Sequence, residues 1–257
     1  MMVFFTVIIA LLLAGIGAVH AENELDIGFA PGDCQSIRFD HARYSVCSFD
    51  PGQHDIRIYH SSEAGRIYGS FTALESDLSI HGTELLFAMN GGMYHRNRDP
   101  VGLYVESGQQ LSDINRNEGP GNFHLMPNGV FYMLDGQGGV LETEVYINAR
   151  ISPNFATQSG PMLVIDGALH PRFLVDGTSK NIRNGVGVRD DGVVMFVLSE
   201  ERVNFHSFGR VFRDRLHIRN ALYLDGSVSR MFHAASARHD YGRRMGPIVG
   251  VTPKPAP

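Results

Sequence analysis

Short runs of β-branched and aromatic residues, separated by Gly, Asp, Asn and Pro, recur along most of this chain. Runs of this length and composition are typical of β-strands. The expected strands lie at residues 44–49, 55–59, 66–71, 85–89, 101–106, 129–134, 162–165, 185–188, 193–198, 221–224 and 248–251. The pattern therefore predicts an α+β fold, a sheet-dominated single domain with a few covering helices.

Turn and helix signals fall between these runs. The segments RDDG at 189–192 and DG at 135–136 predict tight turns, because Asp-Gly suits a hairpin. One helix is expected where Thr72 and Glu75 resemble a capping box. A second is expected after Ser207, where apolar residues recur at helical spacing. Those residues are Phe208, Val211, Phe212 and Leu216.

The amino-terminal segment has a different character. Residues 1–21 contain no Asp, Glu, Lys or Arg, and they give way at once to the polar ENELD. The apolar run is short for the roughly 20 residues of a bilayer span, and small residues precede position 22 at the spacing of a cleavage site. We therefore predict a signal peptide at 1–21 and one exported domain at 22–257, periplasmic or extracellular. The alternative is an uncleaved membrane anchor, since no Lys or Arg precedes the apolar run.

The charge balance restricts the partners. The formal net charge is -5 at pH 7, and no basic run occurs. A nucleic-acid surface needs concentrated positive charge, so we expect no nucleic-acid partner, and no membrane contact once the signal is removed. No sequence feature indicates the oligomeric state.

The chain has two cysteines, Cys34 and Cys47. In an oxidising compartment such a pair is expected to form a disulfide. A loop of this size would contribute roughly 3 kcal/mol. Two buried free thiols are the alternative, while a metal site needs more ligands than this spacing supplies.

Three Gly-rich segments each follow a strand-like run and place polar residues where the chain must turn. They are LFAMNGGMY at 86–94, QSGPMLVIDG at 158–167 and ALYLDGSVS at 221–229. Asn and Asp at strand ends can be simple turn formers, and for any one segment alone that interpretation is the better one. The combination of all three favours a shared site.

The order and spacing of these motifs resemble the phosphodiester glycosidase family over residues 85–251. The matching motifs are NGGMY at 90–94, PVG at 100–102, SGPMLVIDG at 159–167, NIR at 181–183 and YLDGSVS at 223–229. The resemblance implies hydrolysis of a glycosyl phosphodiester of the sugar-1-phosphate type, a small-molecule glycan substrate, with release of free sugar. One departure is that Asp225-Gly226 is followed by Ser227, where family members usually have another glycine.

The chemistry implied by the resemblance requires a cation and a carboxylate. The phosphate must be neutralised as it leaves, and a carboxylate must activate water or donate a proton. We expect Arg183, with Asn90, to hold the phosphodiester, since a guanidinium can bind two phosphate oxygens. The alternative for Arg183 is an exposed charge or a surface ion pair. Asp225 is the expected acid/base, because it ends an apolar strand and burial raises a carboxyl pKa; a turn former is its alternative.

Further substrate contacts are expected from hydroxyls and from backbone amides that could form an anion-binding nest. These residues are Gly91, Gly92, Gly160, Gly226, Ser227 and Ser229. Tyr94 and Tyr104 could line a small sugar pocket, with core packing as the equal alternative. Asp166 ranks below Asp225, because Asp-Gly at 166–167 is typical of a hairpin turn.

Two other classes of function stay open. The twelve histidines include no HExxH and no tight cluster, so no cofactor is required. A divalent cation is left open, since clustered Asp and Asn could ligate one in a metal-dependent phosphodiesterase. The non-enzymatic alternative is a surface-polysaccharide or cell-wall binding module without turnover, for which Ser227 in place of glycine is the best hint.

Overall fold

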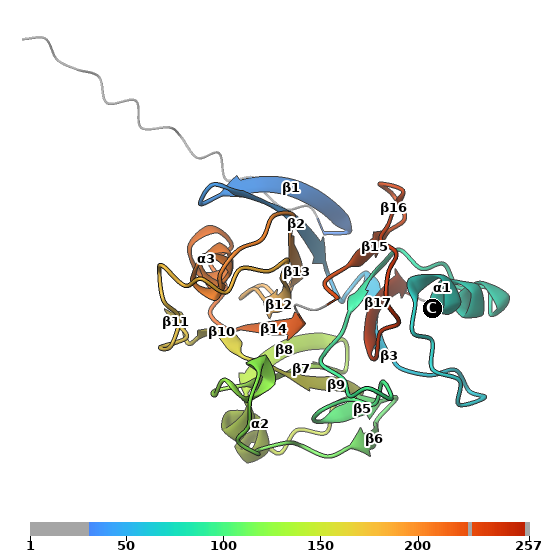
Figure 1. Cartoon of the computed structure of the whole chain (residues 1–257). Coiled ribbons are helices and arrows are strands. Elements are labelled where there is room, and N and C mark those ends of the chain that lie inside the picture. Colours follow the sequence, from blue (N-terminus) through green and yellow to red (C-terminus); the bar gives the residue numbers. More distant parts are fainter. Residues whose placement is uncertain (1–30, 226–227, 255–257) are drawn as a thin grey trace, which may run out of the picture.

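Three antiparallel sheets make up most of the protein, as a computed structural model of residues 31–225 and 228–254 shows (Figure 1). The seven-stranded sheet has the order β1 (Asp33–Phe39), β2 (Ala42–Phe49), β13 (Val194–Ser199), β12 (Asn184–Val188), β14 (Ala221–Asp225), β10 (Met162–Ile165) and β11 (Ala168–Leu169). The β4 sheet has the order β16 (Arg238–His239), β15 (Met231–His233), β4 (Phe87–Asn90), β17 (Ile248–Pro253) and β3 (His54–Tyr59). The β9 sheet has the order β6 (Gln109–Ser112), β5 (Tyr104–Glu106), β9 (Phe155–Ser159), β7 (Gly129–Leu134) and β8 (Gln137–Glu142). The predicted sheet-dominated α+β class is confirmed.

The three sheets surround one shared core. In β13, Phe196 and Leu198 point into this core, whereas Met195 and Val197 belong to a second cluster on the other face of the strand. Successive side chains of a strand point to opposite faces, so a strand buried on both faces must be apolar throughout. This explains the unbroken apolar run VMFVLS of β13.

A helix covers the outer face of each sheet (Figure 1). The helices are α1 (Phe71–Ile80), α2 (Thr143–Ala149) and α3 (Phe205–Arg210), and α3 continues into the π-helical turn η2 (Val211–Arg215). A short 3-10 turn, η1 (Asn122–His124), precedes β7. Phe71 and Leu74 of α1 pack in the cluster on the β4 sheet, and Phe208 of α3 packs on the seven-stranded sheet. Each helix therefore buries its apolar residues against the face of a sheet that points away from the shared core.

The predictions made for residues 66–75 from short sequence patterns are partly wrong. The strand expected at 66–71 does not form: Ile67 makes only an isolated bridge with Ser61, and Phe71 begins α1. The helix is capped by Ser70, whose side chain accepts a hydrogen bond from the backbone of Ala73, and not by Thr72. Over so short a run, the pattern of apolar residues is the same for a helix turn and for a strand, so packing against the sheet decides which of the two forms.

Other expectations differ at their ends. The second helix begins earlier than Ser207, because Asn204 is its cap. The strand expected at 101–106 is reduced to β5. Several strands had not been predicted, including β8 (QGGVLE) and β9 (FATQS), because their residues are polar or glycine and only pairing makes them strands. The turns at 135–136 and 189–192 do join antiparallel partners, as predicted.

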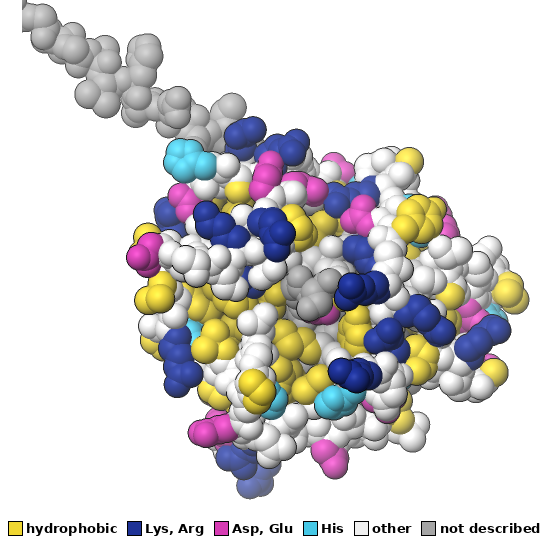
Figure 2. All heavy atoms as spheres, in the orientation of Figure 1, with side chains coloured by type: hydrophobic (Ala, Val, Ile, Leu, Met, Phe, Trp, Pro, Cys, Tyr) yellow, Lys and Arg dark blue, Asp and Glu magenta, His cyan; other side chains and the backbone are white. Residues whose placement is uncertain are grey.

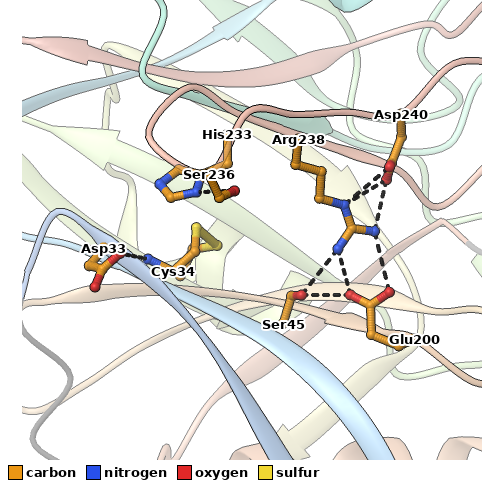
Figure 3. The surroundings of a disulfide bond; sticks show 9 residues. Asp33, Cys34, Ser45, Glu200, His233, Ser236, Arg238 and Asp240 are labelled. Atoms are coloured by element: carbon orange, nitrogen blue, oxygen red, sulfur yellow. Dashed lines mark hydrogen bonds and ion pairs between the residues drawn. A yellow bond between two sulfur atoms is a disulfide. The ribbon is translucent and has the colours of Figure 1, made fainter.

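The predicted disulfide is present between Cys34 and Cys47, which face each other across β1 and β2. Figure 3 shows its surroundings, where Cys34 and Ser45 lie near the β15–β16 hairpin that carries His233 and Arg238. The predicted signal peptide, residues 1–21, lies outside the described residues. Among the residues that are described, no helix has the length and apolarity to cross a membrane.

Candidate functional site

Two buried asparagines join the seven-stranded sheet to the β4 sheet. Asn90 ends β4 and Asn184 begins β12, and both are completely buried. Asn184 Nδ2 donates hydrogen bonds to the backbone oxygen and to Oδ1 of Asn90, at 3.1 and 3.0 Å. Asn90 Nδ2 donates in return to Asn184 Oδ1 at 3.1 Å. The amide pair fixes the end of β4 against the start of β12.

Asp225 and the segment after it attach to this amide pair. The backbone nitrogen of Asp225, the last residue of β14, donates to Asn184 Oδ1 at 3.0 Å. Ser229 Oγ donates to the carbonyl of Ile182 at 3.0 Å, and it also contacts the carbonyl of Asp225. The backbone nitrogen of Arg230 donates to Asn90 Oδ1 at 3.1 Å. The chain thus folds back over the asparagines, and Asp225 is buried with 7% exposure.

The second Gly-rich segment reaches the same place from the β9 sheet. Ser159, at the end of β9, donates through Oγ to the carbonyl of Leu224 at 2.8 Å. Gly160 follows where the chain approaches Asn128 so closely that a Cβ would lie 2.6 Å from that residue's Cβ. The structure therefore brings all three Gly-rich segments together, although they are far apart in sequence.

The first Gly-rich turn is needed for close packing. A Cβ on Gly91 would lie 2.8 Å from the backbone nitrogen of Val249, and one on Gly92 would lie 2.6 Å from Thr157 Oγ1. The amide of Gly91 already donates to the carbonyl of Pro247 at 2.7 Å. The amide of Gly91 is therefore engaged within the protein, contrary to its expected place in an anion-binding nest.

Arg183 is not where the sequence analysis expected it. Its side chain is completely buried, with the guanidinium 3.6 Å from the ring centroid of Phe205. Nε donates to the carbonyl of Val203, and Nη2 donates to the carbonyl of Ser179. Nη1 lies 3.3 Å from the hydroxyl of Tyr223. We correct the expectation that Arg183 grips a phosphate, because its side chain is completely buried and each of its three nitrogens is already bonded to a protein group.

The residue beside Arg183 takes the central place instead. Neighbouring residues of an extended chain point to opposite faces, so Asn184 faces the shared core with Val186, while Arg183 faces Phe205 of α3. The sequence analysis did not identify Asn184. Its signal was a polar residue at a core-facing position of the alternating run NGVGV.

Arg230 is a second arginine at this place, attached to Asn90 through its backbone nitrogen. Burial lowers the pKa of the Arg230 guanidinium, against the opposing fields of Tyr94 and of the Asp240 and Asp225 carboxylates. Burial likewise raises the pKa of Tyr94, with the Asp225 carboxylate adding to the rise. These electrostatic couplings indicate that Arg230, Tyr94 and Asp225 share one environment. Arg230 follows the third motif directly, but the sequence analysis did not identify it.

A hollow of about 650 Å³ opens beside this group. Its described lining consists of Asn181, Ile182, Arg202, Val228, Ser229, Arg230, Tyr241, Gly242 and Arg243. Figure 2 shows Lys and Arg side chains gathered on this face of the molecule. Within the described part of the chain, no Asp or Glu lines the hollow. Its electrostatic character is therefore that of an anion-binding surface.

The remaining expected residues are accounted for as follows. Gly226 and Ser227 lie outside the described residues. Tyr104 is buried in the core, where its hydroxyl donates to Glu106 at 2.7 Å, so it lines no sugar pocket. Asp166 has a φ of 46° in the turn between β10 and β11, as a hairpin turn requires. Within residues 31–225 and 228–254, no group of three or more His, Cys, Asp and Glu side chains is arranged to hold a metal ion.

Comparison with solved structures defines the class of fold. The chain is similar to the catalytic domain of zebrafish N-acetylglucosamine-1-phosphodiester alpha-N-acetylglucosaminidase, with a TM-score of 0.54 and 12% identity over 85% of this chain and 81% of that one. It is also similar to a hypothetical protein from Synechocystis, with a TM-score of 0.52 and 13% identity over 86% of this chain and 61% of that one. At these identities the likeness shows a shared fold.

Sequence comparison gives the family. The phosphodiester glycosidase family model matches residues 83–252. The uncharacterized protein YigE of Escherichia coli strain K12 is 36% identical over 188 residues, which cover 73% of each chain. The chain therefore belongs to the phosphodiester glycosidase family.

Proposed function

We propose that this protein is an exported hydrolase that cleaves a glycosyl phosphodiester of the sugar-1-phosphate type and releases the free sugar. The observation that carries the proposal is the junction of Asp225 and Arg230 on the Asn90–Asn184 pair, in a chain of this family. The zebrafish relative's name supplies the type of substrate, an N-acetylglucosamine-1-phosphodiester.

The reaction needs two complementary charges. The bond between the anomeric carbon and the phosphate oxygen breaks, the phosphate departs as a monoester, and water supplies the new hydroxyl of the sugar. Asp225 takes the proton from the attacking water. Arg230 neutralises the departing phosphate, a role for which a guanidinium is suited because it offers several donors in one plane. Ser229 lies between them and holds the chain in this geometry.

Arg183 is a positioning residue in this proposal. Its guanidinium reaches the hydroxyl of Tyr223, and burial raises the pKa of that hydroxyl, with the Asp225 carboxylate adding to the rise. Tyr223 and Asp225 lie on the same strand. Arg183 therefore contacts β14 through the hydroxyl of Tyr223, while Asn184 bonds to the backbone of Asp225, the last residue of the same strand.

The decisive experiment is hydrolysis of an N-acetylglucosamine-1-phosphodiester by the chain without residues 1–21. Free sugar is the expected product, and Asp225→Asn should lower kcat/KM by at least about 100-fold, since the amide cannot accept the proton. Asp166→Asn is the matched control, because Asn tolerates the same turn conformation and this turn lies at the opposite end of β10 from Gly160. Full activity of Asp225→Asn would remove the assignment.

The same assay separates the two rival functions. Sugar-1-phosphate as the product, with activity lost on adding a chelator, would indicate a metal-dependent phosphodiesterase. Binding of the diester without any product would indicate a module that has lost turnover. Free sugar formed in the presence of the chelator excludes both.

Export is part of the proposal. The Cys34–Cys47 disulfide favours an oxidising compartment, and the apolar residues 1–21 supply a secretion signal. The amino-terminal residue of the protein recovered from cells tests this: a terminus at residue 22 is expected, and a terminus at Met1 would contradict it.

A further inference from the structure

We propose that the arginine hollow binds a second anionic group, carried by the leaving alcohol, so that the preferred substrate is a glycosyl phosphodiester with an additional negative charge beyond the scissile phosphate. The arginine hollow is the cavity that Arg202, Arg230 and Arg243 line. This inference rests on the proposed function, because it names the leaving group of the same reaction.

Among residues 31–225 and 228–254, no carboxylate is paired with the three arginines of the hollow, although Asp225 and Asp240 also act on Arg230. None of them forms an ion pair with a described residue, whereas other arginines of the chain, such as Arg210 and Arg238, do. Nε of Arg202 donates to the carbonyl of Lys180, which brings no negative charge. An anion is therefore the ligand that these guanidinium groups suit, because each offers donors that match anionic oxygens.

Burial of the Arg230 guanidinium carries a free-energy cost that a bound ligand would offset. Its Nε is buried and has no hydrogen-bond partner among the described residues. Its Nη2 contacts the backbone carbonyl of Arg243, so the fork is oriented by the wall of the hollow. Gly242 makes room for it, since a Cβ there would lie 2.8 Å from Nη1 of Arg230. A buried donor without a partner is costly, and an anionic oxygen would satisfy it.

One phosphate does not use the whole hollow. Arg230 is attached to the Asn90 end of the site through its backbone, while Arg202 and Arg243 belong to separate segments on the hollow's wall. A volume of about 650 Å³ is in the range of small-molecule sites and exceeds what a single phosphate fills. The ring of Tyr241, which is stacked on His239 with 4.3 Å between the ring centroids, stands at this wall with 79% exposure. The hollow therefore suits an extended, anionic leaving group.

A matched pair of substrates tests the inference during turnover. One is N-acetylglucosamine-1-phosphate esterified to methanol, and the other is the same sugar phosphate esterified to glycerol phosphate. We expect the wild-type protein to favour the second substrate in kcat/KM, and the double variant Arg202→Gln/Arg243→Gln to lower that preference by about tenfold or more. Arg219→Gln removes the same charge at the other end of β14 from Asp225, and it should keep the wild-type preference. An equal loss on both substrates in the double variant would overturn the inference, because the arginines would then serve only the reacting phosphate.

A binding measurement keeps the inference testable without catalysis. Inorganic pyrophosphate should bind the wild-type chain more tightly than inorganic phosphate does at the same ionic strength. The double variant should weaken pyrophosphate binding by about tenfold, and Arg219→Gln should not. If neither diester is hydrolysed but pyrophosphate binding behaves in this way, the proposed function fails and the anion site stands. If the double variant binds pyrophosphate as the wild type does, the anion site fails, whatever the hydrolysis assay gives.

Discussion

At the scale of single residues, the site depends on one amide side chain. Asn184 gives hydrogen bonds to Asn90 and accepts them from Asn90 and from the backbone of Asp225. It has no exposed surface, so water does not compete for these bonds in the folded protein. Asn184 is therefore the residue whose loss should disturb the whole site without touching the substrate.

We expect Asn184→Ala to lower the free energy of unfolding by about 2–4 kcal/mol, because the amide of Asn90 and the nitrogen of Asp225 lose their buried partners. Asn97→Ala, at an exposed asparagine of the adjacent loop, should cost much less. Chemical denaturation of both variants measures the difference. A small loss in Asn184→Ala would mean that water enters and satisfies the site.

A second prediction concerns pH. Burial raises the pKa of the Glu106 carboxyl, although the Tyr104 hydroxyl and His60 oppose the rise. A carboxyl whose pKa is higher in the folded than in the unfolded state contributes stability below its unfolded pKa and loses it as the pH rises through the folded value. Glu106→Gln should therefore stabilise the protein by roughly a few tenths of a kcal/mol near pH 7, since the group is only partly buried. Thermal unfolding near pH 4 should show no gain; a gain of equal size there would contradict the assignment.

At the scale of elements, Asn204 connects a helix to a loop. Its Oδ1 accepts the hydrogen bond of the Ser207 nitrogen and caps α3, while its Nδ2 donates to the carbonyls of Val175 and Gly177. The loop from β11 to β12 is thereby attached to the helix that covers the seven-stranded sheet. This loop leads directly to Arg183 and Asn184.

Asn204→Ala should lower the free energy of unfolding by about 1–2 kcal/mol, the usual cost of a lost helix cap. Ser207→Ala, at the position that the sequence suggested as the cap, should change it by less than about 0.5 kcal/mol. Equilibrium denaturation in urea compares the two variants. If they are equally unstable, the cap is not at Asn204.

At the scale of the whole molecule, a charged cluster joins two sheets near the disulfide (Figure 3). Arg238 of β16 pairs with Glu200, next to β13, at 2.6 Å, and with Asp240 at 3.0 Å. It also donates to Ser45 Oγ of β2. These contacts join the outer strand of the β4 sheet to the seven-stranded sheet, on the side away from α2.

Arg238→Met should lower the free energy of unfolding by about 2 kcal/mol, because two partly buried carboxylates lose their shared partner. Arg43→Met, whose pair with Glu201 is exposed on both sides, is the matched control and should lose far less. Thermal melts of the two variants at low and high salt would compare them. An equal response would mean that the cluster contributes no more than a surface ion pair.

Part of this protein could be predicted from neighbouring residues alone. The Asp-Gly turns, the apolar strands such as β13, the disulfide and the family all follow from short stretches of sequence, because backbone preferences and side-chain alternation act over a few residues. The polar strand β9 and the helix at Phe71 could not be predicted in this way, since pairing and packing decide them.

The candidate site, like β9, could not be predicted from neighbouring residues alone. The sequence by itself determined which three segments carry the polar residues. Only the tertiary structure decided that Asn184 enters the site while Arg183 is buried on the other side of the sheet. The reason is that one residue of strand register exchanges the two faces of a sheet, and the register of β12 is set by its partners β13 and β14, far away along the chain.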